Sequence, residues 1–312
     1  MNIQDSLDNF IEYQEAKGNS AETVIYYKGN IGRFVQYAGD IEVEDITIKL
    51  LRDYVEHLKS TKKHQNNMFY PDDKKGKISS ISVQTYVRAI RIFMGWLYKE
   101  EFITINFLPI LPLPKAKKKI IEIISNEDIC KINKTFDLNS KNGCRNACIF
   151  SLMIDSGLRL GEVAGLCSKN IDFKESTVKV LGKGNKERIV PFGYETKKRL
   201  YKYINNYRDE SCSDNVFLSE DRPITGEGIK NVFKRISKNI GVSVHPHLLR
   251  HTFATRFIMA GGNLFTLQSI LGHTTLEMVK RYSHLSDTHN RNKARQFSIM
   301  DNLFVKKASG IR

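Results

Sequence analysis

A segment rich in proline and lysine interrupts the chain at residues 109–119, PILPLPKAKKK. Its three prolines exclude a regular helix, because proline lacks a backbone N–H and clashes with the preceding turn. Four lysines then fall within five positions, either as a solvated surface or along a phosphate backbone, and we favour the phosphate contact. The 312-residue chain can hold two domains, so we interpret residues 109–120 as a basic linker between them.

Residues 1–108 have apolar side chains at three- and four-residue spacing, which is the period of amphipathic helices. The pattern predicts four helices with Ser and Thr residues as N-terminal caps. We expect these helices to begin near Ile3, Ser20, Thr47 and Ser80. Residues 61–78 contain Pro, Gly and charged residues without a period, so they are expected to form an exposed loop.

Residues 121–296 show a mixed pattern that predicts helices and one hairpin. The helices are expected at 126–135, 143–155, 159–166, 194–206, 226–239 and 247–285, the last broken at Gly261-Gly262 and at Gly272. The stretch TVKVLGKGNKERIVPF at 177–192 predicts two short strands joined by a Gly-Lys-Gly-Asn turn. The expected fold class is therefore mainly α with a small β-sheet, with a four-helix N-terminal domain and a mixed α/β C-terminal domain.

The net charge of +15 and the pI near 9.5 favour a polyanionic partner. Nucleic acid is preferred over a membrane surface, because the sequence has no basic amphipathic anchor and no apolar run long enough for a membrane span. Residues 120–312 hold most of the surplus, with 31 Lys and Arg against 19 Asp and Glu. The first thirty residues lack a secretory signal, so a cytoplasmic location is expected.

The cysteines are odd in number and lack the spacing of a zinc site, so we expect small buried residues and predict no metal. They are Cys130, Cys144, Cys148, Cys167 and Cys212.

Cutting a phosphodiester without a metal requires a nucleophile, cations for the non-bridging oxygens and a proton donor for the leaving oxygen. The segment DSGLRLGEVAGL at 155–166 places Arg159 at a helix start after Gly157, where its guanidinium could face a phosphate. Glu162, three residues on, could hold Arg159 by an ion pair or cap the turn. The alternative for Arg159 is an ordinary surface residue.

The predicted hairpin and the helix expected near Pro246 supply further candidates for the same chemistry. Lys183 is expected at the tip of the hairpin, and Lys186 and Arg188 beside it could merely touch backbone phosphates. His247 and Arg250 are three residues apart on a helix expected to begin near Pro246, so they should project from one face.

A zinc site is the alternative for the histidines, because His247 and His251 have the four-residue spacing of a helical metal pair. Leu248 occupies the position where a metallohydrolase of that motif needs Glu, which argues against zinc.

The segment LGHTTLEMVKRYSHL at 271–285 places His273 at a helix start and Tyr282 nine residues on. Taken alone, a tyrosine at that spacing could equally be half-buried core.

The ordered set Arg159, Lys183, His247-Leu-Leu-Arg250, Leu-Gly-His273 and Tyr282 closely resembles the tyrosine recombinase family, which includes phage integrases, Xer proteins and Cre. The resemblance implies a SAM-like core-binding domain at 1–108 and a tyrosine recombinase catalytic domain at 121–296. It makes Tyr282 the nucleophile that forms a 3′-phosphotyrosyl link. It also implies that phosphate oxygens are bound by Arg159, Arg250, His247 and His273, that Lys183 protonates the leaving 5′ oxygen, and that Glu162 supports Arg159.

The resemblance implies a site-specific recombinase that acts on double-stranded DNA with inverted-repeat core sites, as a homo-tetramer or with a paralogous partner. It requires no cofactor and implies no membrane contact, so the protein is expected to be cytoplasmic and nucleoid-associated. Because the helices begin almost at Met1, we expect the Xer-like arrangement without an arm-binding domain. The tail at 297–312 is expected to contact a neighbouring subunit or to cap its own domain. The alternatives are a type IB topoisomerase and a catalytically silent DNA-binding protein.

Overall fold

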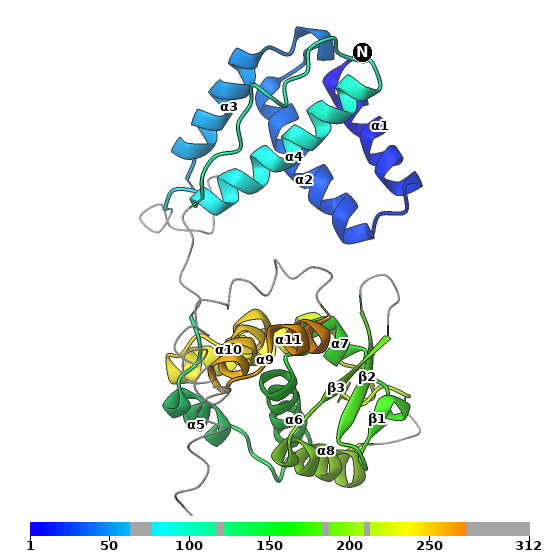
Figure 1. The fold of residues 1–312 in the computed structure, drawn as a ribbon, viewed down its shortest axis with the longest axis vertical. Helices are drawn as coiled ribbons and strands as arrows, with labels where there is room; N and C mark the ends of the chain where they lie inside the picture. Colours follow the sequence, from blue (N-terminus) through cyan, green and yellow to red (C-terminus); the bar gives the residue numbers. More distant parts are fainter. Residues whose placement is uncertain (63–75, 117–121, 183–186, 209–212, 273–312) are drawn as a thin grey trace, which may run out of the picture. The chain divides into compact units, whose positions relative to one another are not determined.

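A computed structural model of the chain describes residues 1–62, 76–116, 122–182, 187–208 and 213–272. The chain divides into two compact units, Met1–Lys119 and Ile120–Arg312 (Figure 1). Each unit has its own hydrophobic core. The prediction of a mainly α-helical protein with a small sheet is confirmed.

The described residues of the first unit form four α-helices, as the periodicity predicts, and one short 3-10 helix at Val43–Asp45. The α-helices are α1 (Ile3–Ala16), α2 (Ala21–Ala38), α3 (Ile48–Ser60) and α4 (Ser80–Lys99). Ser20 and Thr47 cap α2 and α3, because their side-chain oxygens accept the backbone N–H groups that the first turn leaves unpaired. Phe10 packs edge-on against Phe93 and Trp96, which joins α1 to α4 at the centre of the core.

The proline-rich segment predicted as a linker packs against the first unit over its initial part. Leu111 is buried in the core of this unit. The guanidinium of Arg91 on α4 donates to the carbonyl oxygens of Leu108, at 2.7 Å, and Leu111, and Gln84 donates to that of Pro114 at 2.9 Å. The reason is that this non-helical chain leaves its carbonyl groups free to accept side-chain hydrogen bonds from a neighbouring helix. Residues 117–121 lie outside the described residues.

The second unit is mixed, with helices around a small antiparallel sheet. Its helices are α5 (Asn126–Lys134), α6 (Lys141–Ser156), α7 (Leu160–Ala164), α8 (Tyr194–Tyr207), α9 (Gly226–Ile240), α10 (Pro246–Met259) and α11 (Leu264–Leu271). Its strands are β1 (Ile171–Asp172), β2 (Thr177–Leu181), β3 (Glu187–Pro191), β4 (Leu218–Ser219) and β5 (Arg222–Pro223). The sheet order is β1-β2-β3, and β4 pairs separately with β5.

The predicted hairpin is present in the register Val178↔Val190 and Val180↔Arg188. The sequence did not predict β1, β4 or β5, because strands of two residues are too short to show an alternating pattern. The expected break after α10 occurs at Gly261-Gly262, and Gly272 ends α11 in the left-handed conformation. The helical prediction for residues 273–285 and the hairpin turn at 183–186 lie outside the described residues.

Helix α6 is the centre of the second core. It packs against α8 and α10, and its Cys144, Cys148, Leu152 and Met153 are buried. The prediction that the cysteines are buried is right for Cys144 and Cys148, whereas Cys130 on α5 is exposed and Cys167 is half-buried. Cys212 lies outside the described residues. Because α6 is buried along most of its length, its C-terminal end is held in a fixed position for the turn that follows.

No helix among the described residues is both long enough and apolar enough to cross a membrane.

The carboxylate of Asp155 near the end of α6 caps α8, because its Oδ2 accepts the backbone N–H of Gly193 and the hydroxyl of Thr196, the latter at 3.0 Å. We expect Asp155→Ala to lower the free energy of unfolding by about 1 kcal/mol, the usual cost of losing a helix cap. Urea denaturation followed by circular dichroism measures this change. Asp221→Ala is the matched control, because Asp221 is exposed and its ion pair with Lys141 is long, at 3.8 Å. Equal effects of the two substitutions would contradict the capping role.

Candidate functional site

The turn between α6 and α7 is the base of the candidate site. Gly157 ends α6 with φ +65°, in the left-handed region that favours glycine. A Cβ at this position would lie 2.5 Å from Cδ1 of Phe253 and 2.8 Å from Cδ2 of Leu271, so only glycine lets α10 and α11 approach. The turn places Arg159 at the N-cap position of α7, as the sequence predicts.

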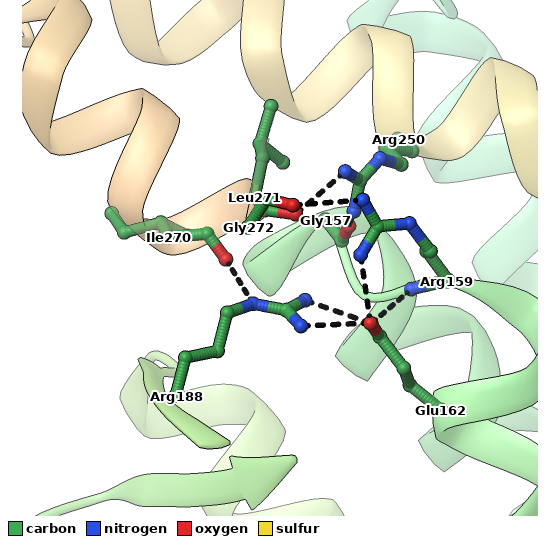
Figure 2. A network of polar contacts seen from close by, with 8 residues as sticks. All are labelled: Gly157, Arg159, Glu162, Arg188, Arg250, Ile270, Leu271 and Gly272. Atoms are coloured by element: carbon green, nitrogen blue, oxygen red, sulfur yellow. Dashed lines mark hydrogen bonds and ion pairs between the residues drawn. The ribbon is translucent and has the colours of Figure 1, made fainter. Parts of the chain in front are cut away.

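Glu162 holds Arg159 in both of the ways that the sequence left open. Its Oε2 accepts the backbone N–H of Arg159 at 2.8 Å, and its Oε1 pairs with Nη1 of the same residue at 2.9 Å. Figure 2 shows a second guanidinium on the same carboxylate. Nη1 and Nη2 of Arg188 donate to Oε1 and Oε2 at 2.7 and 2.8 Å. The Glu162 side chain is only 7% exposed, so a carboxylate is buried between two arginines.

The structure corrects the sequence interpretation of Arg188. The sequence left open that this residue touches backbone phosphates, but its side chain is 10% exposed and binds Glu162. Its Nε also donates to the carbonyl oxygen of Ile270 at 2.8 Å. The strand pattern contained the signal, because Arg188 lies two residues before the buried Val190 and so shares its face of β3.

Arg250 lies in the interior next to these residues. It is on α10, is 9% exposed, and donates to the carbonyl oxygens of Gly157 at 2.6 Å and Leu271 at 2.8 Å. His247 is exposed in the first turn of the same helix, which begins at Pro246 as predicted. The described contacts therefore bring Arg159, Glu162 and Arg250 together, and α10 connects them to His247. Lys183, His273 and Tyr282 lie outside the described residues.

The C-terminal end of α11 receives three arginines. Arg188, Arg250 and Arg159 donate to the carbonyl oxygens of three successive residues (Figure 2). These acceptors are Ile270, Leu271 and Gly272. A helix leaves its last carbonyls unpaired and carries partial negative charge at this end, so cations are the expected partners. The contacts fix the point at which the chain leaves α11 toward residue 273.

The charges of this cluster suit an anionic ligand. Burial alone would raise the pKa of Glu162, but the hydrogen bonds from Arg188 and from the backbone of Arg159 outweigh burial and hold that pKa below its usual value. The carboxylate is therefore ionised, and the three arginines leave the cluster with a net charge of +2. Guanidinium groups match phosphate in shape and charge, so the arrangement can bind a phosphate group.

Among the described residues, no three His, Cys, Asp or Glu side chains lie close enough together to hold a metal ion. The zinc alternative for the histidines therefore has no support there. His245 has a structural role, since its Nδ1 accepts the backbone N–H of Leu248 and caps α10.

We expect Glu162→Gln to destabilise the second unit by about 3 kcal/mol near neutral pH, because the buried guanidinium of Arg188 loses its compensating charge. The pKa of Glu162 is lower in the folded chain than its usual 4.5, so its stabilising effect is complete above that value and is lost as the pH falls through the folded pKa. The difference in unfolding free energy between wild type and Glu162→Gln should therefore shrink in acid. Urea denaturation at a series of pH values measures it, and a constant difference would contradict the assignment.

Comparison with known proteins gives the same family for both units. Residues 122–289 match the phage integrase family, and residues 3–120 match the phage integrase SAM-like domain. Tyrosine recombinase XerC of Anoxybacillus flavithermus is 29% identical over 300 residues, covering 93% of this chain and 96% of the relative. Tyrosine recombinase XerD of Staphylococcus haemolyticus is 32% identical over 226 residues, covering 70% and 77%.

Solved structures share the fold. The Tn1549 transposon integrase in complex with transposon right end DNA gives a TM-score of 0.71 at 17% identity, covering 93% of this chain and 98% of that chain. A lambda integrase dimer bound to a COC′ core site gives a TM-score of 0.68 at 20% identity, covering 93% and 97%. Because the catalytic family model alone matches more than half of the chain, the protein belongs to the phage integrase family and is a tyrosine site-specific recombinase.

Proposed function

We propose that this site cuts and rejoins DNA with Tyr282 as the nucleophile. The observation that carries the proposal is the arginine cluster, in which Arg159 and Arg188 share the carboxylate of Glu162. Arg250 donates beside them to the carbonyl oxygen of Leu271. Arg159 is the most exposed of these arginines, with 37% of its side chain accessible, so it can meet a phosphate in solution while Glu162 orients it. Arg250 and His247 bind the same phosphate from α10.

The proposed reaction exchanges one phosphoester for another. The Tyr282 oxygen attacks the scissile phosphorus, a 3′-phosphotyrosyl bond forms, and the bond to the 5′ oxygen breaks. The phenolic proton of Tyr282 passes to solvent water, and Lys183 supplies a proton to the leaving oxygen, so a 5′-hydroxyl is released. Arg159 and Arg250, with His247 and His273, stabilise the charge on the non-bridging oxygens, and each charged donor contributes about 2–4 kcal/mol by comparison with oxyanion-hole donors. Because the bond energy is kept in the adduct, rejoining requires no nucleotide.

The proposed DNA partner is a duplex with inverted-repeat core sites, bound by four protomers of this chain or with a paralogous partner. Support comes from the solved relatives, which include a lambda integrase tetramer bound to a Holliday junction, with a TM-score of 0.65 at 18% identity. In this arrangement the N-terminal domain, residues 1–108, binds DNA, and the catalytic domain, residues 121–296, cuts it. The linker at 109–120 joins the two domains, and the tail at 297–312 contacts a neighbouring protomer. Such a protein acts in the cytoplasm on the nucleoid.

The face of the first unit formed by α2 and α4 is the proposed DNA-binding surface. Exposed cations lie there, and the guanidinium of Arg33 lies over the ring of Tyr86. Burial raises the pKa of Tyr26, and the nearby charge of Arg88 opposes that rise. The outer face of α1 carries carboxylates instead. These are Asp5, Asp8, Glu12 and Glu15, all exposed. The unit can therefore bind DNA although residues 1–114 hold 15 Asp and Glu against 14 Lys and Arg.

The decisive experiment needs no knowledge of the target sequence. Fragmented DNA from the source of the protein is incubated with the full chain and denatured, and the covalently attached fragments are sequenced. We expect 3′-linked adducts with wild type and none with Tyr282→Phe, because phenylalanine has no oxygen to attack phosphorus.

Tyr201→Phe is the control for this experiment, since Tyr201 is an exposed tyrosine of the same unit. It should form adducts at the wild-type level. DNA binding without adducts in wild type, even on nicked DNA that traps the intermediate, would favour a silent DNA-binding protein. Adducts that relax supercoils without exchanging strands between duplexes would favour a type IB topoisomerase.

We expect Arg88→Gln to weaken binding to all DNA sequences similarly and to reduce the slope of log affinity against log salt concentration by about one, because one phosphate contact is lost. Fluorescence anisotropy with a labelled duplex at several salt concentrations measures both effects. Asp8→Asn on α1 should leave the slope unchanged. A slope that responds to Asp8→Asn instead would place the DNA on the other face.

A further inference from the structure

Arg188 is the one arginine of the cluster to which the proposed chemistry gives no direct role. It lies on β3, and its described hydrogen bonds all point inward, to the Glu162 carboxylate and the Ile270 carbonyl (Figure 2). The side chain is 10% exposed, so it is poorly placed to touch DNA itself. Its influence on the reaction must pass through the residues that it holds.

The first effect of Arg188 is on the orientation of Arg159. Both oxygens of Glu162 are shared between the two arginines: Oε1 accepts from Nη1 of each, and Oε2 accepts from the Arg159 backbone and from Nη2 of Arg188. The two-pronged contact from Arg188 fixes the plane of the carboxylate. Because that carboxylate also binds the Arg159 side chain, the direction of the Arg159 guanidinium follows from it.

The second effect is on charge. Arg159 and Glu162 alone would form a neutral pair with little attraction for a phosphate. Arg188 adds a positive charge on the far side of the carboxylate, so the three groups together carry +1. Because the side chains of Arg188 and Glu162 are largely buried, water screens this added charge less than it would screen a surface charge.

A third attachment ties Arg188 to the end of α11. Besides the hydrogen bond to Ile270, its side chain lies against Gly272, where a Cβ would come within 3.0 Å of Arg188 Cδ. Gly272 in turn accepts a hydrogen bond from Nη2 of Arg159 at 3.1 Å. The end of α11 is therefore a second route by which Arg188 fixes Arg159.

We propose that Arg188 is a positioning residue for strand cleavage, which acts through Glu162 and the end of α11 to keep Arg159 oriented and positively charged toward the scissile phosphate. This inference rests on the proposed function. It assigns to a strand residue a part in phosphate binding without contact between that residue and the DNA.

The test compares two substrates, both nicked duplexes that carry the site recovered by covalent capture. One has the ordinary scissile phosphodiester, and the other has a methylphosphonate, in which a neutral methyl replaces a charged non-bridging oxygen. We expect Arg188→Met to form the Tyr282 adduct about 10- to 100-fold more slowly than wild type on the phosphodiester, because Arg159 is misplaced. On the methylphosphonate the two proteins should differ less than about threefold, because less negative charge needs compensation.

Two further variants separate positioning from folding. Arg188→Lys keeps the charge but lacks the two-pronged contact, so its rate on the phosphodiester should fall between those of wild type and Arg188→Met. Arg145→Met is the matched control, because Arg145 is also buried, at 5% exposure, and donates to a carbonyl, that of Leu218, away from the cluster. Its ratio of rates on the two substrates should equal that of wild type, even where its melting temperature falls.

An equal loss on both substrates for Arg188→Met would overturn the inference, because Arg188 would then only maintain the fold. An unchanged rate on the phosphodiester would overturn it as well. In both cases wild-type cleavage would leave the proposed function standing. A wild-type chain that forms no Tyr282-dependent adduct would overturn the proposed function and this inference together.

Discussion

The burial of the Glu162 carboxylate is the constraint on which the geometry of the second unit depends. Burying a carboxylate to 7% exposure costs free energy unless nearly every lone pair accepts a hydrogen bond. Here each of the two oxygens accepts two hydrogen bonds. The donors come from the start of α7 and from β3. Satisfying one side chain therefore requires that the hairpin and α7 meet at a fixed distance, which no apolar contact would specify as narrowly.

The turn at Gly157 is the second requirement, because it lets three helices meet beside that carboxylate. Its carbonyl accepts from Arg250, and its missing side chain leaves space for Phe253 of α10 and Leu271 of α11. The burial of α6 against α8 and α10 then transmits this position to the rest of the core. Local backbone conformation and side-chain electrostatics thus serve one purpose, which is to place cations at one point.

Much of the fold follows from local patterns in the sequence, and much of the site does not. The caps at Ser20 and Thr47, the two strands of the hairpin and the break after α10 each depend on neighbouring residues, which a sequence displays directly. The role of Arg188 depends on Glu162, 26 positions away, and on the end of α11, 82 positions away. The packing of Leu111 against α4 escaped prediction for the same reason, since prolines exclude a helix but do not say what the extended chain contacts.

In the proposed reaction, the contacts within the cluster would fix the arginines before DNA arrives and still leave donors to bind it. A guanidinium has five N–H donors, and the described side-chain contacts of Arg159 engage one terminal nitrogen with Glu162 and the other with Gly272. Each terminal nitrogen carries two hydrogens, so the plane of the group is set by protein acceptors while donors remain for a phosphate. Since those acceptors are a buried carboxylate and the end of a helix, they hold their places as the phosphate gains charge. Little reorganisation is then required in the transition state, which is the condition under which fixed dipoles and charges accelerate a reaction most.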